Sequence, residues 1–263
     1  MRKYLVILRQ SILDSLAYGP VAFVWVLIEL VEVIAPLAIW YGAIPLGSSI
    51  GGYSKLQMLY YYALIVIVRG FTTWYVWSPV SNQIRNGDFS NLLVKPLPAI
   101  IQIIVGEVGW KIIRTVVQLP LIIGISALLI FYLPGHDYSM NIAFLASLIL
   151  GSLVSLLISS CFAALSFWIT DMGGFNGLYF FLSYILSGEL APLSVYPQWF
   201  GVTALSLPFR YIVSFPLEIF FKKLDLQSIL YSFGAGIVWT LFLFWLTRYL
   251  WRRGITNYQA YGK

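Results

Sequence analysis

Residues 141–169 read NIAFLASLILGSLVSLLISSCFAALSFWI, a run without one charged side chain. A helix needs about 20 mostly apolar residues to cross a bilayer, so this run predicts a transmembrane helix. A small side chain recurs at every fourth position, which places these residues along one face of that helix. The face consists of Ala143, Ser147, Gly151, Ser155, Ser159 and Ala163. Small residues let helices approach closely in lipid, so we expect close packing inside the protein or across a dimer; a polar lining for a substrate path is the alternative.

Outward from this run, the whole chain is apolar. The protein has 263 residues, of which 60% are hydrophobic and 10% are charged. Soluble domains carry about 25% charged residues, so this composition indicates an integral membrane protein. Aromatic residues make up 17% of the chain, which suits belts at the two membrane interfaces. The net charge of +6 is scattered along the sequence, which argues against a nucleic-acid partner.

Five further runs are long and apolar enough for transmembrane helices, so we predict six spans in a single all-α domain covering residues 1–263. They are Val21–Tyr41, Leu56–Trp77, Thr115–Tyr132 (with an earlier start left open), Phe175–Leu190 and Ile229–Trp251. Residues 188–225, before the last run, are apolar but contain four prolines, which prevent one continuous span. We expect short re-entrant or interfacial helices there, on the outer side of the membrane.

The two ends of the chain are predicted to lie on the cytoplasmic side. Residues 1–18 show a pattern typical of a helix that lies in the membrane interface, with Leu5, Leu8, Ile12 and Leu16 on one side. Lysine and arginine are more frequent in the short segments on the side of the termini, and such segments stay in the cytoplasm. We therefore expect a multi-pass protein of the inner (plasma) membrane with both termini cytoplasmic.

Three charged residues lie inside predicted spans: Glu29 and Glu32 in the first and Arg69 in the second. A charge deep in a bilayer costs at least about 2.5 kcal/mol, so it usually has a partner or a task. At 1.5 Å per residue, Glu29 and Arg69 both lie about 12 Å from the cytoplasmic ends of their helices. The sequence therefore predicts a Glu29–Arg69 ion pair. Glu32 is expected to share Arg69 or to face a cavity, and recognition of a cationic or polar substrate is the alternative role for these charges.

A second group of charges, Glu107, Lys111 and Arg114, precedes the third span. Glu107 and Lys111 are four residues apart, in the order that favours an ion pair on a helix surface. We interpret this group as a solvated, cytoplasmic extension of the helix.

A polar insert, RNGDFSNLLVKPLP at residues 85–98, separates two apolar runs within the cytoplasmic loop 79–100. Asp88 after Gly87 is typical of a helix start. Phe89, Leu92 and Leu93 would then share one helix face, and Pro96 would end the helix. The pattern predicts a docking element that offers apolar side chains to a groove in a partner. A helix that rests on lipid is the alternative.

The sequence lacks the motifs of the common catalytic and cofactor sites. It contains no GxxxxGK[ST] loop for nucleotide phosphates and no HExxH zinc motif. Its only cysteine, Cys161, lies in an apolar run, and its only histidine, His136, lies in a predicted loop. We therefore expect no catalytic, cofactor or metal site within this chain.

Two stretches resemble a known family. IRNGDFSNLLVKPLP is similar to the cytoplasmic loop of ABC-2 type transporter permeases, with the matching residues Gly87, Asp88, Leu92, Leu93, Lys95 and Pro96. SGELAPLSVYPQWF, followed by LPFRYIVSFPLEI, is similar to the proline-rich stretch before the last span of that family. Together with the six spans, the resemblance covers nearly the whole chain.

The resemblance implies the transmembrane subunit of an ABC exporter. A second permease chain, identical or paralogous, would complete the membrane part, and two separate ABC ATPase subunits would bind ATP and magnesium. The loop 79–100 would be the coupling helix, in which Phe89 and the matching residues contact the ATPase, and residues 1–18 would be the elbow helix. The substrate would be amphipathic or hydrophobic, and the glutamates favour a cationic one.

Two other classes of membrane protein compete with this interpretation. A secondary transporter or channel would work without an ATPase and would not need the insert. An intramembrane enzyme would need a catalytic group of histidine, cysteine or carboxylate residues, which the sequence does not show.

Overall fold

The computed structural model describes residues 2–17, 19–45, 47–132, 141–169 and 172–258. The helices of this part are α1 (Arg2–Ala17), α2 (Gly19–Ala43), α3 (Lys55–Thr72), α4 (Trp77–Arg85), α5 (Ser90–Leu93), α6 (Ala99–Tyr132), α7 (Ile142–Leu165), α8 (Gly173–Leu186), α9 (Gln198–Ser206), α10 (Ser214–Phe220) and α11 (Leu226–Asn257). Two short 3₁₀ helices, Leu193–Val195 and Pro208–Tyr211, flank α9.

A small β-hairpin is the one departure from helix among the described elements. Strands β1 (Ser49–Ile50) and β2 (Tyr53–Ser54) pair in an antiparallel manner. Gly51 and Gly52 form the turn at positive φ angles of 59° and 80°, a conformation that glycine adopts without strain. The predicted all-α class therefore describes the body of the protein but omits this hairpin.

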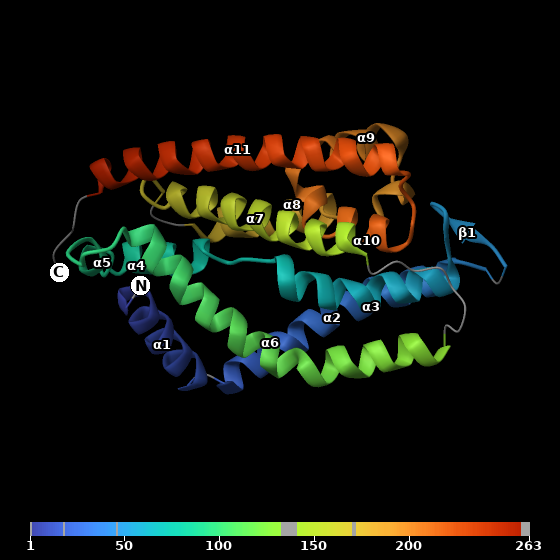
Figure 1. The fold of residues 1–263 in the computed structure, drawn as a ribbon, viewed down its shortest axis with the longest axis horizontal. Helices are drawn as coiled ribbons and strands as arrows, with labels where there is room; N and C mark the ends of the chain where they lie inside the picture. Colours follow the sequence, from blue (N-terminus) through green and yellow to red (C-terminus); the bar gives the residue numbers. More distant parts are fainter. Residues whose placement is uncertain (1, 18, 46, 133–140, 170–171, 259–263) are drawn as a thin grey trace.

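The long helices lie along one common direction, with α7 and α11 side by side and α2, α3 and α6 on the other side (Figure 1). Both termini lie at one end of the molecule, together with α1, α4 and α5. The hairpin, α9 and α10 lie at the opposite end. The predicted topology requires this grouping, in which the termini and the insert 85–98 share one side.

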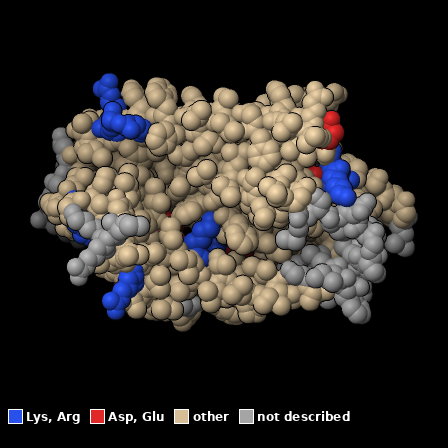
Figure 2. Space-filling model, in the orientation of Figure 1, with Lys and Arg blue, Asp and Glu red and all other residues tan. Residues whose placement is uncertain are grey.

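The surface agrees with a membrane-embedded protein. Figure 2 shows lysine and arginine toward the two ends and at one hollow in the middle, with a broad uncharged band between them. Within the described residues, three stretches are long and apolar enough to cross a membrane: Phe23–Ala43, Ile142–Leu165 and Leu226–Asn257. Helices α3 and α4 add a fourth if this bent pair counts as one span. Six spans therefore stay a prediction, because neither α6 nor α8 is among these stretches, and α8 has 14 residues, fewer than the roughly 20 that cross a bilayer.

The second predicted span, Leu56–Trp77, is wrong at its C-terminal end. Helix α3 stops at Thr72, and α4 starts at Trp77 at an angle of 53°. Groups on neighbouring helices satisfy the open backbone between them: the N–H groups of Trp74 and Trp77 donate to the hydroxyls of Ser155 and Ser159, at 3.2 and 3.4 Å. Non-helical backbone persists inside a membrane protein only where such partners exist. Sequence periodicity cannot reveal partners that come from a distant helix.

The small-residue face of α7 is packed inside the chain. Ser147, Gly151, Ser155 and Ser159 are all buried within this single chain. Two of the serines hold the α3–α4 break, and Gly151 lies against the backbone of Tyr211. Of the alternatives that the sequence left open, close packing inside the protein explains this face.

Replacement of Gly151 by alanine is expected to destabilise the protein. A Cβ atom there would overlap the Tyr211 carbonyl oxygen, so the backbone must move. Overpacking of this kind costs about 1–3 kcal/mol, and the expected result is a lower midpoint of thermal unfolding in detergent. Gly124→Ala in α6 is the matched control, because nothing lies within 4 Å of its added methyl group. Equal stability of the two variants would contradict the internal packing.

The terminal and outer regions form the helices that the sequence predicts. Helix α1 covers most of residues 1–18 and packs on α6, where the Ser11 hydroxyl donates to the Gly106 carbonyl. Residues 188–225 form only short helices, and the Tyr61 and Tyr62 hydroxyls of α3 donate to carbonyls of this region. Asp225 caps α11 by accepting from the Ser228 N–H group, and hydrogen bonds with the side chain and then the backbone of Ser228 lower the pKa of Asp225. The position of these regions relative to lipid stays a prediction.

Candidate functional site

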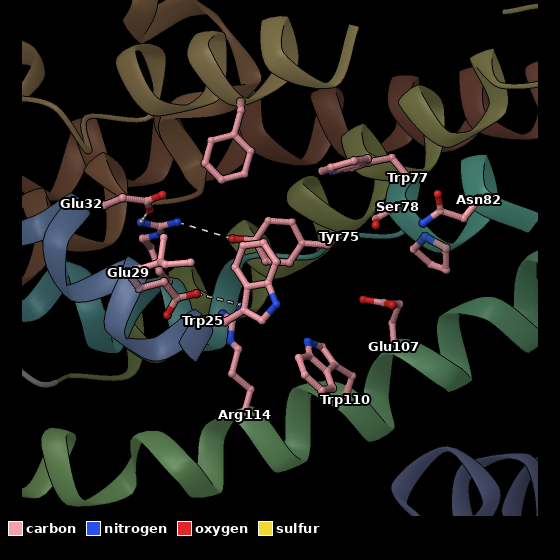
Figure 3. Close-up of a pocket in the computed structure, with 14 residues that line it drawn as sticks. Trp25, Glu29, Glu32, Tyr75, Trp77, Ser78, Asn82, Glu107, Trp110 and Arg114 are labelled. Atoms are coloured by element: carbon pink, nitrogen blue, oxygen red, sulfur yellow. Dashed lines mark hydrogen bonds and ion pairs between the residues drawn. The ribbon is translucent and has the colours of Figure 1, made fainter. Parts of the chain in front are cut away.

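A cavity of about 630 Å³ lies between α2, α3, α4, α6 and α8 (Figure 3). This volume falls within the range of about 300–1,000 Å³ that small-molecule sites occupy. The break between α3 and α4 forms part of its wall, through Tyr75 and Trp77. Aromatic and charged side chains line the cavity together: Trp25, Glu29, Glu32, Arg69, Tyr75, Trp77, Glu107, Trp110, Arg114 and Phe180.

Arg69 lies between two carboxylates. Its Nη1 atom is 2.9 Å from Glu32 Oε2 and 3.3 Å from Glu189 Oε2. The side chains of Arg69 and Glu189 are only 5% and 7% exposed, so these charges compensate one another away from water. Glu189 comes from the proline-rich region 188–225, and the sequence analysis did not identify it. The sequence does contain a signal for Glu189, because it is the only acidic residue in the apolar stretch between Asp171 and Glu218.

Glu29 has a different partner from the one predicted. Its Oε1 atom is 3.2 Å from Arg114 Nη1, and its other oxygen accepts a hydrogen bond from Gln118. The expected Glu29–Arg69 ion pair is therefore wrong. Glu32 combines the two roles that the sequence left open, because it pairs with Arg69 and also lines the cavity. A third helix, α6, brings Arg114 beside Glu29. The positions of Glu29 and Arg69 along the first two predicted spans cannot reveal this partner.

The charges at the start of α6 are not a solvated extension. Arg114 is 4% exposed, and the Lys111 ammonium donates to the carbonyls of Phe71 and Thr73 at 2.7 and 3.2 Å. Lys111 also lies 4.3 Å from the centre of the Trp74 ring. Because α6 starts at Ala99, sixteen residues before the predicted span, these side chains fall inside the helix bundle. Lys111 thereby supplies hydrogen bonds to carbonyls that the break in α3 leaves open.

The insert is anchored by a buried aromatic side chain. Phe89 is 0% exposed, and its ring packs edge to face on Phe167 and Tyr258 and lies near Trp251. The expectation that Phe89 projects toward a partner together with Leu92 and Leu93 is therefore wrong. Its ring points into the chain because the ends of α7 and α11 form an aromatic pocket around it. Leu92 is half-buried against the same cluster.

A short apolar tip remains exposed beside this anchor. Helix α5 is a single turn without a side-chain cap, so the expected capping by Asp88 is wrong. Leu93 and Val94 are 41% and 84% exposed, and Lys95 and Pro96 are exposed as well. Gly87 adopts a φ of +78°, which turns the chain from α4 into α5. Gln102 of α6 then donates to the carbonyls of Leu92 and Leu97, which holds the tip in place.

Metal binding or a nucleophile would need particular side chains among the described residues. No group of three or more metal-binding side chains occurs among the described residues. Cys161 is buried between α7 and α11, where its Sγ atom lies 3.1 Å from the Thr247 hydroxyl. His136 lies outside the described residues.

A family model described as ABC-2 family transporter protein matches residues 30–262. The chain belongs to the ABC-2 transporter family. The match includes the broken span, the insert and most of the cavity lining, so this site lies within the ABC-2 permease domain. ABC-2 permeases generally work with ABC ATPase subunits. No curated protein matches the chain.

Proposed function

We propose that this ABC-2 permease is the membrane subunit of an ATP-driven exporter, with ATP and magnesium bound by two separate ATPase subunits. One observation carries the proposal: the exposed tip Leu93–Pro96 is attached to α4, which forms a wall of the cavity. A force on the tip therefore reaches the cavity through a single continuous segment. A channel or secondary transporter has no use for such a connection.

The geometry suggests how movement at the tip would reach the cavity. Phe89 ties the insert to the ends of α7 and α11, so the tip cannot move without these helices. Helix α4 carries Trp77, Ser78 and Asn82 of the cavity lining and begins directly after the four-residue break that follows α3. Backbone breaks absorb changes of direction more readily than continuous helix. Closure of the ATPases would thus turn α4 about this break and open the cavity outward.

The substrate follows from the lining. An amphipathic or hydrophobic molecule of drug size fits a cavity that is lined by both aromatic and charged side chains. In the proposed complex a second permease chain, identical or paralogous, faces this one in the inner membrane. The termini and the insert lie on the cytoplasmic side, with the ATPases.

The double variant Leu93→Ala/Val94→Ala tests the proposal. Burying one such side chain is worth about 1.5 kcal/mol or more, so the loss of both is expected to weaken ATPase binding by about 3 kcal/mol, roughly a hundredfold. Copurification of the ATPase and transport are then lost together, while thermal stability stays unchanged, because both side chains are exposed.

The matched control is Leu226→Ala/Val238→Ala, which removes the same two side chains from exposed positions on α11, away from the insert. This control should copurify with the ATPase like the parent. Full copurification and unchanged transport in the Leu93→Ala/Val94→Ala variant would contradict the coupling role and would favour a transporter or channel that works without an ATPase.

A further inference from the structure

The Glu107 carboxylate points into the cavity and has no partner there. Figure 3 shows it on α6, directed toward the space between Trp110 and Tyr75. It accepts no hydrogen bond from any described residue and forms no close ion pair with one, and the cations Arg114 and Lys111 act on it only at longer range. The other two carboxylates of the lining, Glu29 and Glu32, are each paired with an arginine. Glu107 is therefore the carboxylate of the lining that is free to meet a ligand.

The charge of the lining is negative. It contains three carboxylates and two guanidinium groups, and Glu189 adds a further carboxylate behind Arg69. Lys111, one turn from Glu107 on α6, directs its ammonium group to the carbonyls of Phe71 and Thr73 instead. The unpaired N–H groups of Arg69 and Arg114 are fully buried and have no surface open to the cavity. The electrostatic field in the cavity thus favours a cation over an anion.

The wall around Glu107 is aromatic. Trp110 lies three residues further along the same face of α6, Trp25 comes from α2, and Trp77 comes from α4. Tryptophan faces attract organic cations through the ring quadrupole, most strongly where water is excluded. A metal ion would instead require several oxygen ligands at once, and Glu107 is the sole free carboxylate among the described residues of this lining.

We propose that the cavity binds a monovalent organic cation with an aromatic, apolar body, its charge beside Glu107 and its body against Trp25, Trp77 and Trp110. This inference rests on the proposed function, because it names the substrate class of the same exporter. A neutral compound would gain no charge interaction with Glu107, and an anion would be repelled by it.

Two probe ions of the same shape and opposite charge test the proposal: tetraphenylphosphonium and tetraphenylborate. The purified full chain in lipid nanodiscs is titrated with each ion, and quenching of tryptophan fluorescence reports binding. The parent is expected to prefer the cation. Glu107→Gln should weaken cation binding by at least about tenfold, which corresponds to about 1.4 kcal/mol, and should leave tetraphenylborate binding equal or tighter. Asp14→Asn removes the same charge from an exposed position on α1 and should change nothing.

Two further variants keep the test decisive if Glu107→Gln does not fold. Glu107→Asp retains the charge and should retain the preference for the cation. Trp110→Leu retains the carboxylate but removes the ring, and should weaken cation binding about three- to tenfold. If the parent binds both ions equally or binds neither, or if these variants leave cation binding unchanged, the cation site is wrong. The exporter proposal would still stand, because this measurement uses no ATPase. Failure of the parent chain to copurify with an ATPase would contradict the exporter and would leave the cation site unaffected.

Discussion

Replacement of Arg69 by leucine is expected to lower the free energy of unfolding by about 3–5 kcal/mol, because it removes one partner of a buried charge cluster. The substitution leaves Glu189, which is 7% exposed, and Glu32, which is 27% exposed, without their cation. Leucine cannot replace the ion pairs, and the other guanidinium group of the cavity lining, Arg114, is engaged with Glu29. The expected result is a large decrease in the thermal unfolding temperature of the purified protein in detergent.

Double variants identify which carboxylate depends on Arg69. Removal of both partners of a buried pair can be nearly neutral, so Arg69→Leu/Glu189→Leu should regain much of the stability that Arg69→Leu loses. Arg69→Leu/Glu29→Gln should regain much less, because Glu29 pairs directly with Arg114 and interacts with Arg69 only at longer range. The observed pairing would be wrong if Arg69→Leu/Glu29→Gln regained stability while Arg69→Leu/Glu189→Leu showed additive losses of stability.

Replacement of Phe89 by alanine is the other substitution with a large expected effect. Truncation of a fully buried phenylalanine costs about 3–5 kcal/mol, and Phe89 is 0% exposed within the cluster of Phe167, Trp251 and Tyr258. The loss should loosen the insert from α7 and α11. We therefore expect lower thermal stability together with weaker coupling between ATP hydrolysis and transport.

Stability and ATPase copurification, measured on the same preparation, separate the two roles of the insert. Phe89→Ala should lower stability, whereas Leu93→Ala/Val94→Ala should lower copurification alone. Phe181→Ala on α8 is the control for a phenylalanine that is 61% exposed, and its stability should stay near that of the parent. A Phe89→Ala protein with parental stability and no bound ATPase would show that Phe89 contacts the partner after all.

Features that depend on neighbours in sequence were predictable. The composition and the run 141–169 identify a membrane protein, since apolar length is a property of the sequence itself. Prolines in 188–225 predict short helices, and the structure has them, because a proline disrupts the helix in which it lies. The position of the insert and the resemblance to ABC-2 permeases also follow from local patterns, and the family match confirms the latter.

The tertiary structure decided which of these residues meet. Glu29 pairs with Arg114 rather than Arg69 because α6 packs beside α2, a neighbour relation that no local pattern encodes. Phe89 shares a sequence pattern with Leu93, yet one is buried and the other exposed, since the ends of α7 and α11 cover only one side of the insert. Glu107 has no close partner in the cavity, because Lys111 of the same helix turn donates to the carbonyls of Phe71 and Thr73 instead. Sequence alone determined the class of the protein and its elements, whereas partners depend on contacts between helices far apart in the chain, which only the folded arrangement specifies.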